Sequence, residues 1–158
     1  MLLRIERVKW KTEHLKKINM RNYLAKIKIP VDLSNKSTGK IGEEMFNIWF
    51  NRNFEDEKVF DQLADRDYQQ IDFACEKGIT YQVKATRAKT YTFNQPIDTL
   101  LEHLNADRYV FIQIKDNYAY IENIYEKDYI LNNIKKSFKE SNQCFVYSKN
   151  LLQYKIEI

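Results

Sequence analysis

The segment 67–86 is the part of the sequence that most restricts the fold, because it predicts two short β-strands joined by a tight turn. The turn is expected at Gly78, which supplies the positive φ that a three-residue hairpin loop requires. A loop of this length fixes the register of the two strands. The expected cross-strand pairs are Asp72 with Gln82, and Gln70 with Lys84.

The side chains of this hairpin are expected to divide into two faces, since successive residues of a strand point to opposite sides. One face is apolar and belongs to the core: Ile71, Phe73, Cys75, Ile79, Tyr81 and Val83. The other face is polar: Gln70, Asp72, Thr80, Gln82 and Lys84. Solvated polar faces are common in amphipathic hairpins. However, an aspartate, a carboxamide and a lysine gathered within one cross-strand pair and its neighbour also make a candidate site.

The spacing Asp-x9-Gln-x-Lys, formed by Asp72, Gln82 and Lys84, resembles the core motif of the PD-(D/E)xK nuclease superfamily in its Gln-x-Lys variant. The resemblance implies a DNA endonuclease that depends on Mg²⁺, with Mn²⁺ expected to substitute. The sequence departs from the commonest pattern at two positions. Gln82 replaces a carboxylate, which removes one negative charge from the expected site, and Ile71 stands where a proline usually precedes the aspartate.

The segment 37–51 predicts an amphipathic helix, because Ser37 or Thr38 can cap it and apolar residues recur at helical spacing. Its sequence GKIGEEMFNIWF is similar to the first helix of the superfamily, in which a glutamate after a glycine joins the metal site. Glu43 is therefore the expected ligand, and Glu44 is the reserve. A helix N-terminus also favours carboxylates electrostatically, so the alternative for either glutamate is a purely structural role at the start of the helix.

The resemblance also implies a role for each site residue. The expected metal ligands are Asp72, Gln82, Glu43 and the backbone carbonyl of Val83. These are oxygen donors, which suit the hard Mg²⁺ ion. Lys84 is expected to orient the attacking water and to stabilise developing negative charge. Contacts with double-stranded DNA are expected from Arg87, Lys89 and Gln70.

The remaining periodicity predicts an α/β fold. A strand is expected within 57–63, a polar loop at 86–96 and a buried strand at 108–114. Between the loop and the buried strand, a helix is expected to open with Pro96 as its first residue. Its apolar face comprises Ile97, Leu100, Leu101 and Leu104. The order helix, strand, strand, strand, helix, strand over about 38–115 matches the αβββαβ core of the superfamily. We therefore expect a restriction-endonuclease-like core, with a central mixed sheet flanked by helices and with N- and C-terminal additions. A second strand at 118–124, a helix near 127–138 and a strand at 144–147 are expected to follow.

The length of 158 residues favours one nuclease-like domain over 1–158. Its expected parts are a basic accessory segment 1–36, a catalytic core 37–115 and a C-terminal extension 116–158. Residues 1–40 carry 11 Lys and Arg against 3 Asp and Glu, whereas the remainder carries 15 against 19. This asymmetry favours contact with a polyanion such as nucleic acid, and a general lysine bias is the alternative.

The opening segment is too charged for a signal peptide, and no stretch is apolar enough to span a membrane. We expect an intracellular protein, in the cytoplasm or an organelle interior, that is not secreted and has no membrane partner. Cutting two strands with one small domain requires paired sites, which predicts a homodimer or homotetramer. A homing or restriction enzyme is the first expectation and a Holliday-junction resolvase the second. The alternatives of another class are a catalytically inactive DNA-binding module and an unrelated α/β structural protein.

Overall fold

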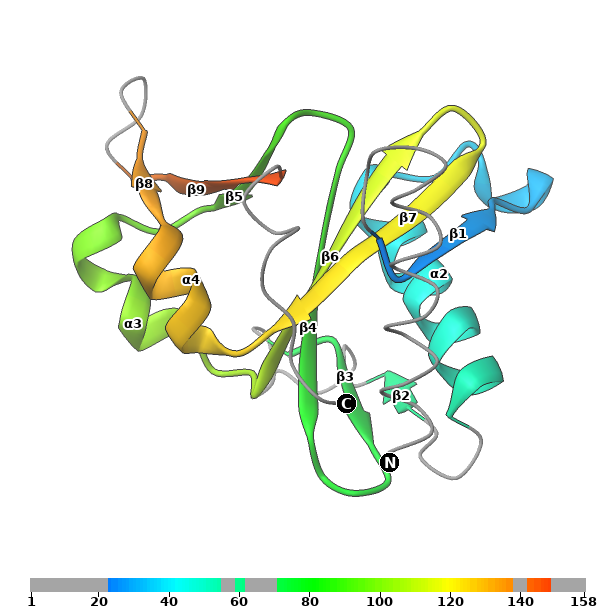
Figure 1. Cartoon of the computed structure of the whole chain (residues 1–158), viewed down its shortest axis with the longest axis horizontal. Coiled ribbons are helices and arrows are strands. Elements are labelled where there is room, and N and C mark those ends of the chain that lie inside the picture. Colours follow the sequence, from blue (N-terminus) through cyan, green and yellow to red (C-terminus); the bar gives the residue numbers. More distant parts are fainter. Residues whose placement is uncertain (1–22, 55–58, 62–70, 138–141, 149–158) are drawn as a thin grey trace.

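The computed structural model describes residues 23–54, 59–61, 71–137 and 142–148 (Figure 1). The strands are β1 Ala25–Lys28, β2 Val59–Asp61, β3 Phe73–Cys75, β4 Thr80–Thr86, β5 Thr90–Phe93, β6 Arg108–Lys115, β7 Tyr118–Tyr125, β8 Lys135–Lys136 and β9 Cys144–Tyr147. The helices are α2 Thr38–Asn53, α3 Leu100–His103 and α4 Lys127–Asn133, with 3₁₀ turns at Val31–Leu33 and Ile97–Thr99. The expected DNA contact Gln70 and most of the accessory segment 1–36 lie outside the described residues.

The main sheet has six strands in the order β1-β7-β6-β4-β3-β2, and a second sheet has the order β5-β9-β8. Strands β2, β3 and β4 pair antiparallel in succession, whereas β6 pairs parallel to β4. Strands β7 and β1 then continue the sheet in antiparallel pairing. The main sheet is thus mixed, and the expected α/β class is confirmed. None of the described helices is both long and apolar enough to cross a membrane.

The β3–β4 hairpin has the expected loop and register. Phe73 pairs with Tyr81 and Ala74 with Thr80. Gly78 has a φ of 83°, and its amide donates a 2.9 Å hydrogen bond to the carbonyl of Cys75. The glycine is needed here because other residues rarely adopt this backbone conformation.

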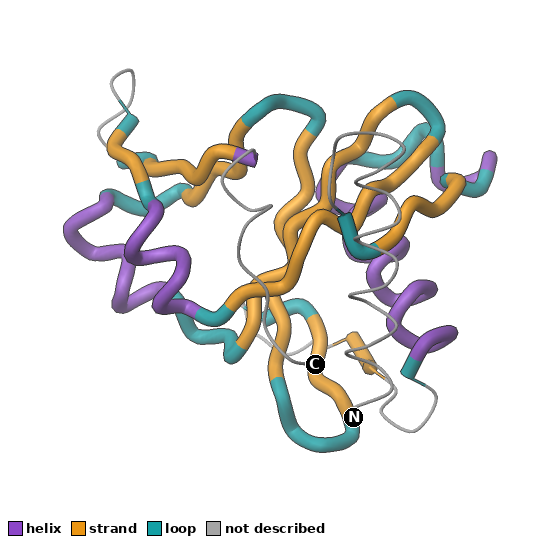
Figure 2. Tube along the Cα trace, viewed as in Figure 1, coloured by secondary structure: helices purple, strands orange, loops and turns teal. Residues whose placement is uncertain are grey.

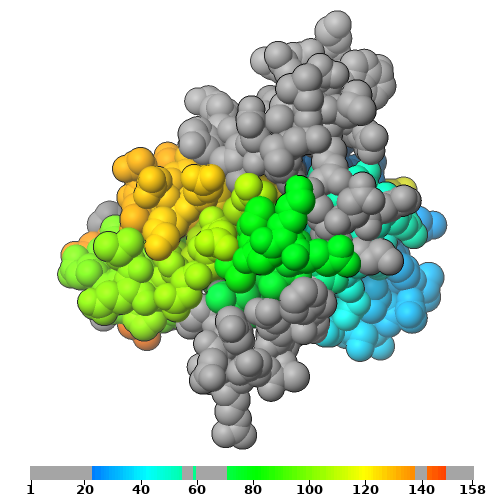
Figure 3. Space-filling model, turned by 90° about the horizontal axis from the view of Figure 1, so that it is seen from below, coloured from blue at the N-terminus to red at the C-terminus, as the bar shows by residue number. Residues whose placement is uncertain are grey.

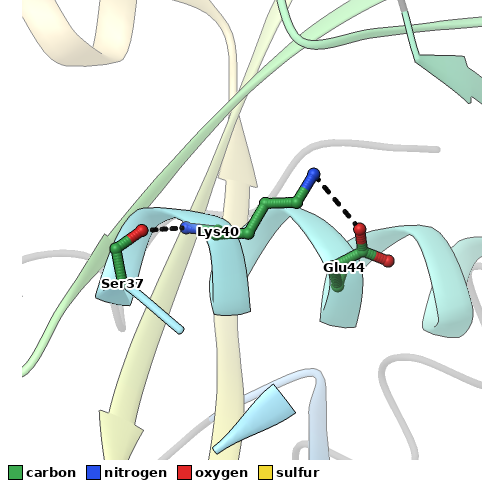
Figure 4. Close-up of polar contacts among 3 residues, drawn as sticks. All are labelled: Ser37, Lys40 and Glu44. Atoms are coloured by element: carbon green, nitrogen blue, oxygen red, sulfur yellow. Dashed lines mark hydrogen bonds and ion pairs between the residues drawn. The ribbon is translucent and has the colours of Figure 1, made fainter. Parts of the chain in front are cut away.

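Helix α2 also begins where the sequence predicts, with Ser37 as its cap. The Ser37 hydroxyl accepts a 3.3 Å hydrogen bond from the amide of Lys40 (Figure 4). The buried side of the helix comprises Ile41, Gly42, Met45, Phe46, Trp49 and Phe50. Gly42 lies directly on β4, because a Cβ atom added to it would overlap the Cβ of Ala85. The absence of a side chain at this position lets the helix approach the strand closely.

The main sheet separates two hydrophobic clusters. In the backbone trace, α2 lies on one side of this sheet and α3 and α4 lie on the other (Figure 2). The first cluster lies between the sheet and α2. The second cluster lies on the opposite face, where β5, β9, α3 and α4 cover the sheet. Ile71 belongs to the second cluster, although the alternation predicted it on the same face as Phe73. The prediction was wrong because β3 begins only at Phe73, so strand alternation does not extend to Ile71.

Three expected boundaries differ from the structure. The expected polar loop 86–96 contains strand β5, whose Tyr91 and Phe93 are buried against the second cluster. The helix expected to open at Pro96 starts as a 3₁₀ turn after that residue, and its α-helical part has four residues. Leu101, expected on the apolar face, is therefore 57% exposed. The helix expected to reach 138 ends at Asn133, where β8 takes over to pair with β9.

The second cluster contains tyrosines whose ionisation the fold opposes. Burial raises the pKa values of Tyr109, Tyr125 and Tyr129 above the ordinary value. The rings of Tyr125 and Tyr129 are stacked, with centroids 4.0 Å apart and planes 12° apart. A phenolate in this cluster would lose hydration, which disfavours the charged form.

We expect the free energy of unfolding to fall as the pH rises above about 10, the ordinary pKa of tyrosine. In that range the unfolded chain loses protons that the folded chain retains, so the slope of stability against pH is negative. Each such proton contributes about 1.4 kcal/mol per pH unit. Urea denaturation between pH 7 and 11 measures the slope, and Tyr125→Phe should reduce it. Tyr147→Phe, at an exposed position, is the matched control and should leave the slope unchanged.

Candidate active site

Asp72 lies at the point where β3 separates from β4. Its amide donates a 2.9 Å hydrogen bond to the carbonyl of Tyr81, and its Oδ2 accepts a 2.7 Å hydrogen bond from the amide of Val83. The side-chain carboxylate thus takes the place of a backbone partner for β4. A short bond from an amide to a charged oxygen is one of the stronger types. It holds the carboxylate, which belongs to a residue only 8% exposed, against the strand that carries the other motif residues.

The backbone carbonyl of Val83 points towards the same edge as the Asp72 carboxylate. In an antiparallel ladder the N–H and C=O of one residue face the same neighbouring strand. The Val83 amide faces Asp72, and the Tyr81 carbonyl two residues earlier also faces β3. The Val83 carbonyl therefore lies on the β3 side of β4, where the sequence places a metal ligand.

Gln82 and Lys84 point to the face of the sheet opposite α2. Their neighbours Tyr81 and Val83 pack in the first cluster, so alternation directs Gln82 and Lys84 towards the second. Gln82 is only 9% exposed, and within the described part of the chain no hydrogen bond reaches its carboxamide. The carboxamide oxygen is therefore not committed to another described group.

The second sheet covers the Lys84 side chain. Its Nζ lies 4.6 Å from the centroid of the Phe93 ring on β5, and Cys144 is paired with Phe93 across β5 and β9. Burial lowers the pKa of the Lys84 ammonium, and the negative charge of Asp72 opposes this change. Burial also raises the pKa of the Cys144 thiol, which is therefore neutral near pH 7. The charge of Asp72 thus opposes the loss of the Lys84 proton that burial favours.

Helical geometry places Glu43 on the flank of α2 that faces the hairpin. Phe46, three residues later and on the same flank, has its ring 5.4 Å from the rings of Phe73 and Tyr81. Gly42 contacts β4 beside Val83 and Ala85, whereas Phe46, later in the helix, contacts Tyr81, earlier in the strand. Helix α2 therefore runs antiparallel to β4. Glu43 therefore lies one turn before Phe46, level with the part of β4 that Asp72 contacts. Figure 3 shows this end of the molecule, with the hairpin between α2 on one side and α3 and α4 on the other.

Glu44, the reserve ligand, lies on the outer side of the helix. Its carboxylate is 3.2 Å from the Nζ of Lys40, and its side chain is 36% exposed. Figure 4 shows the two side chains together along one side of α2. A step of two residues from Gly42 turns Glu44 by about 200° away from the face that touches β4. The geometry favours Glu43 over Glu44.

The two expected DNA contacts that the structure describes lie in the segment between β4 and β5. Arg87 donates a 3.2 Å hydrogen bond from Nε to the hydroxyl of Thr38, at the start of α2. Lys89 is exposed, and its carbonyl accepts a 2.9 Å hydrogen bond from the amide of Ser148. The Gln113 carboxamide donates to the carbonyl of Ala88 at 3.0 Å. This segment is thus fixed at three points, with Arg87 held beside α2.

The expected ligands are of the chemical type that a hard divalent cation binds. No group of three His, Cys, Asp or Glu side chains gathers among the residues that the structure describes. The expected ligand set is not a group of that type. It comprises the carboxylates of Asp72 and Glu43, one amide oxygen and one backbone carbonyl. All four are oxygen donors of the type that Mg²⁺ and Mn²⁺ bind.

Sequence reasoning missed Glu122, a carboxylate that is 1% exposed on β7. It lies where the β6–β7 register shifts. Its Oε1 accepts hydrogen bonds of 3.1 Å from the Tyr91 hydroxyl and 2.6 Å from the Ser148 hydroxyl. The carboxylate thus ties β5 and the end of β9 to the main sheet, on the face that carries Lys84. A glutamate inside the apolar segment YIENI was the available signal.

No protein-family model matches the chain, and no curated protein matches it. The function must therefore be inferred from the residues and their geometry.

Proposed function

We propose that the chain is a Mg²⁺-dependent DNA endonuclease of the PD-(D/E)xK superfamily, of the homing or restriction type. The hydrogen bond of 2.7 Å from the Val83 amide to Asp72 carries this proposal. It brings the motif aspartate to the segment of β4 that holds Gln82 and Lys84. Asp72 then lies beside the strand from which Gln82 and Lys84 project, which supports a shared site.

The chain order of the elements supports the same proposal. Helix α2, the antiparallel strands β2 to β4, helix α3 and the parallel strand β6 follow in the order of an αβββαβ core. Strand β5 interrupts this order, but it belongs to the second sheet. We interpret β5, β8 and β9 as an addition to a restriction-endonuclease-like core, and β1 and β7 as an extension of its sheet.

Each site residue has a distinct task in this proposal. When bound, Mg²⁺ supplies charge neutralisation at the phosphate and a water molecule of lowered pKa. Asp72, Gln82, Glu43 and the Val83 carbonyl would hold the ion at the rim of the sheet, which Gln82 would approach from the face opposite α2 and Glu43 from α2. Lys84 donates hydrogen bonds to the attacking water and to the oxygen on which charge develops. Its burial beside Phe93 strengthens these interactions, because water screens them less.

Double-strand cleavage by so small a chain requires two copies of the site, so we propose a homodimer or homotetramer acting on double-stranded DNA. A Holliday-junction resolvase is the alternative within the same chemistry. An inactive DNA-binding module is the alternative in another class, and the neutral Gln82 is the observation that favours it.

Nicking of supercoiled plasmid DNA tests the proposal. The protein is incubated with Mg²⁺, Mn²⁺, Ca²⁺ or a chelator, and four-way junction DNA serves as a second substrate. Cleavage with Mg²⁺ and Mn²⁺ but not with the chelator is the expected result. Preferential cutting of the junction favours the resolvase. Binding of DNA without cleavage under any metal condition would overturn the enzyme proposal and support the inactive module.

Substitution of each of the two glutamates of α2 by glutamine tests the ligand assignment. Glu43→Gln is expected to lower cleavage by about 10- to 100-fold, because it weakens metal binding. Glu44→Gln removes the same charge one residue away and is expected to change cleavage less than twofold. Cleavage rates are measured over a series of Mg²⁺ concentrations. A larger loss in Glu44→Gln than in Glu43→Gln would reverse the assignment.

A further inference from the structure

Three lysines and two tyrosines gather on one face of the main sheet. In one cross-strand row Tyr118 of β7 lies between Lys28 of β1 and Lys115 of β6. In the next row Tyr120 is paired with Lys26. The intervening residues of β1 and β7 pack in the first cluster, so all five side chains point away from α2. We call these five residues the lysine–tyrosine face.

The lysine–tyrosine face carries unneutralised positive charge. Lys26, Lys28 and Lys115 are exposed, and within the described part of the chain none of them forms an ion pair. The ammonium of Lys26 lies 4.4 Å from the centroid of the Tyr118 ring and 5.7 Å from that of Tyr120. A cation–π contact of this kind orders the side chain while leaving its charge available.

The lysine–tyrosine face is continuous with the segment that follows β4. Thr86 of β4, Gln113 of β6, Tyr120 of β7 and Lys26 of β1 share one row across four adjacent strands. Three strand spacings give about 14 Å between the ends of this row. Gln113 also holds Ala88, between Arg87 and Lys89. One phosphate backbone can therefore pass from the exposed Lys89 to the lysines of β1.

Charge complementarity selects the occupant of this face. A second copy of the chain is the other candidate, because β1 is an edge strand of the main sheet. However, lysines on an edge strand oppose pairing with another strand, and two copies would bring six ammonium groups together. A polyanion instead gains attraction from each lysine and releases bound counterions.

We propose that the lysine–tyrosine face binds the phosphate backbone of DNA that extends beyond the cleavage site. The inference rests on the proposed function for the identity of the ligand. Binding at this face does not require a metal ion, so it is measured without cleavage. The contacts are to phosphates, which fix the position of a duplex without reading its sequence.

The test uses the full chain and a fluorescent 30-base-pair DNA duplex in the presence of a chelator. Fluorescence anisotropy gives the affinity at several KCl concentrations, for the wild type and for K26Q/K28Q/K115Q. The slope of log K against log [KCl] is expected to shrink by about 1 for each lysine that contacts a phosphate. The matched control is K127Q/K135Q/K136Q, which removes three exposed lysines from α4 and β8. These elements lie on the other side of the molecule from β1 (Figure 1).

The outcomes separate this inference from the proposed function. A reduced salt dependence in the first triple variant alone supports the inference, whether or not the wild type cleaves DNA. Equal binding by both triple variants overturns it, even if the wild type is an active nuclease. A change from one oligomeric state to another in K26Q/K28Q/K115Q, measured by light scattering, would show that the face joins two copies and would also overturn it.

Discussion

Lys84→Met is expected to lower DNA cleavage by about 100- to 1000-fold and to leave the protein at least as stable as the wild type. Methionine keeps an unbranched side chain against the ring of Phe93 and removes the ammonium. Burial lowers the pKa of Lys84, which means that the fold disfavours its charged form. A lowered lysine pKa is typical of groups with a chemical task, so removal of this amine should not destabilise the fold.

Asp72→Asn is the companion to this variant. An asparagine still offers an oxygen to the amide of Val83, so the separation of β3 from β4 is preserved. The loss of negative charge weakens the proposed metal ligand, and cleavage should fall at least as far as in Lys84→Met. Plasmid nicking measures the rates, and thermal unfolding confirms that both variants fold. Wild-type rates in both variants would show that the hairpin does not carry the chemistry.

Gly42→Ala is expected to lower the free energy of unfolding by about 1–3 kcal/mol. The new methyl group would overlap the Cβ of Ala85, and it would also meet Val83 Cγ1 at 3.5 Å. Since Ala85 belongs to a strand paired with β6, the helix has to move. The displacement would also shift Glu43, the next residue, relative to the hairpin.

Gly39→Ala is the matched control, because it adds the same atom one turn earlier in α2 with nothing within 4 Å. Alanine favours helix by up to about 1 kcal/mol over glycine, so this variant should be slightly more stable than the wild type. Adding Ala85→Gly to Gly42→Ala should recover part of the loss. Urea denaturation of the four proteins measures these differences. Equal stability of Gly42→Ala and Gly39→Ala would show that α2 does not depend on close contact at Gly42.

Local rules predicted the central elements of this chain well. Gly78 and the lengths of the flanking apolar segments determine the hairpin and its register, because turn geometry depends on residues close in sequence. Ser37 and the helical spacing of apolar residues determine where α2 begins. The continuous apolar segments predicted β6 and β7. The same rules assigned 86–96 to a loop, although the alternation of Tyr91 and Phe93 was a strand signal.

Only part of the arrangement of the candidate site could be predicted from the sequence. The sequence supplied Asp72, Gln82 and Lys84 and their expected proximity. It did not predict that β5 and β9 cover Lys84, because that pairing joins residues about 50 positions apart, and local propensity carries no information on such contacts. Glu122 was missed for the same reason, since its partners Tyr91 and Ser148 come from the second sheet.

The hairpin, its register and the motif residues on it were determined by the sequence alone, since a three-residue loop allows one pairing of its strands. Only the tertiary structure decided the environment of those residues. The close approach of α2 at Gly42 brings Glu43 to the level of Asp72, and the second sheet covers part of the Lys84 side chain. Both effects depend on packing between segments distant in sequence, where shape and burial rather than local pattern determine which side chains meet.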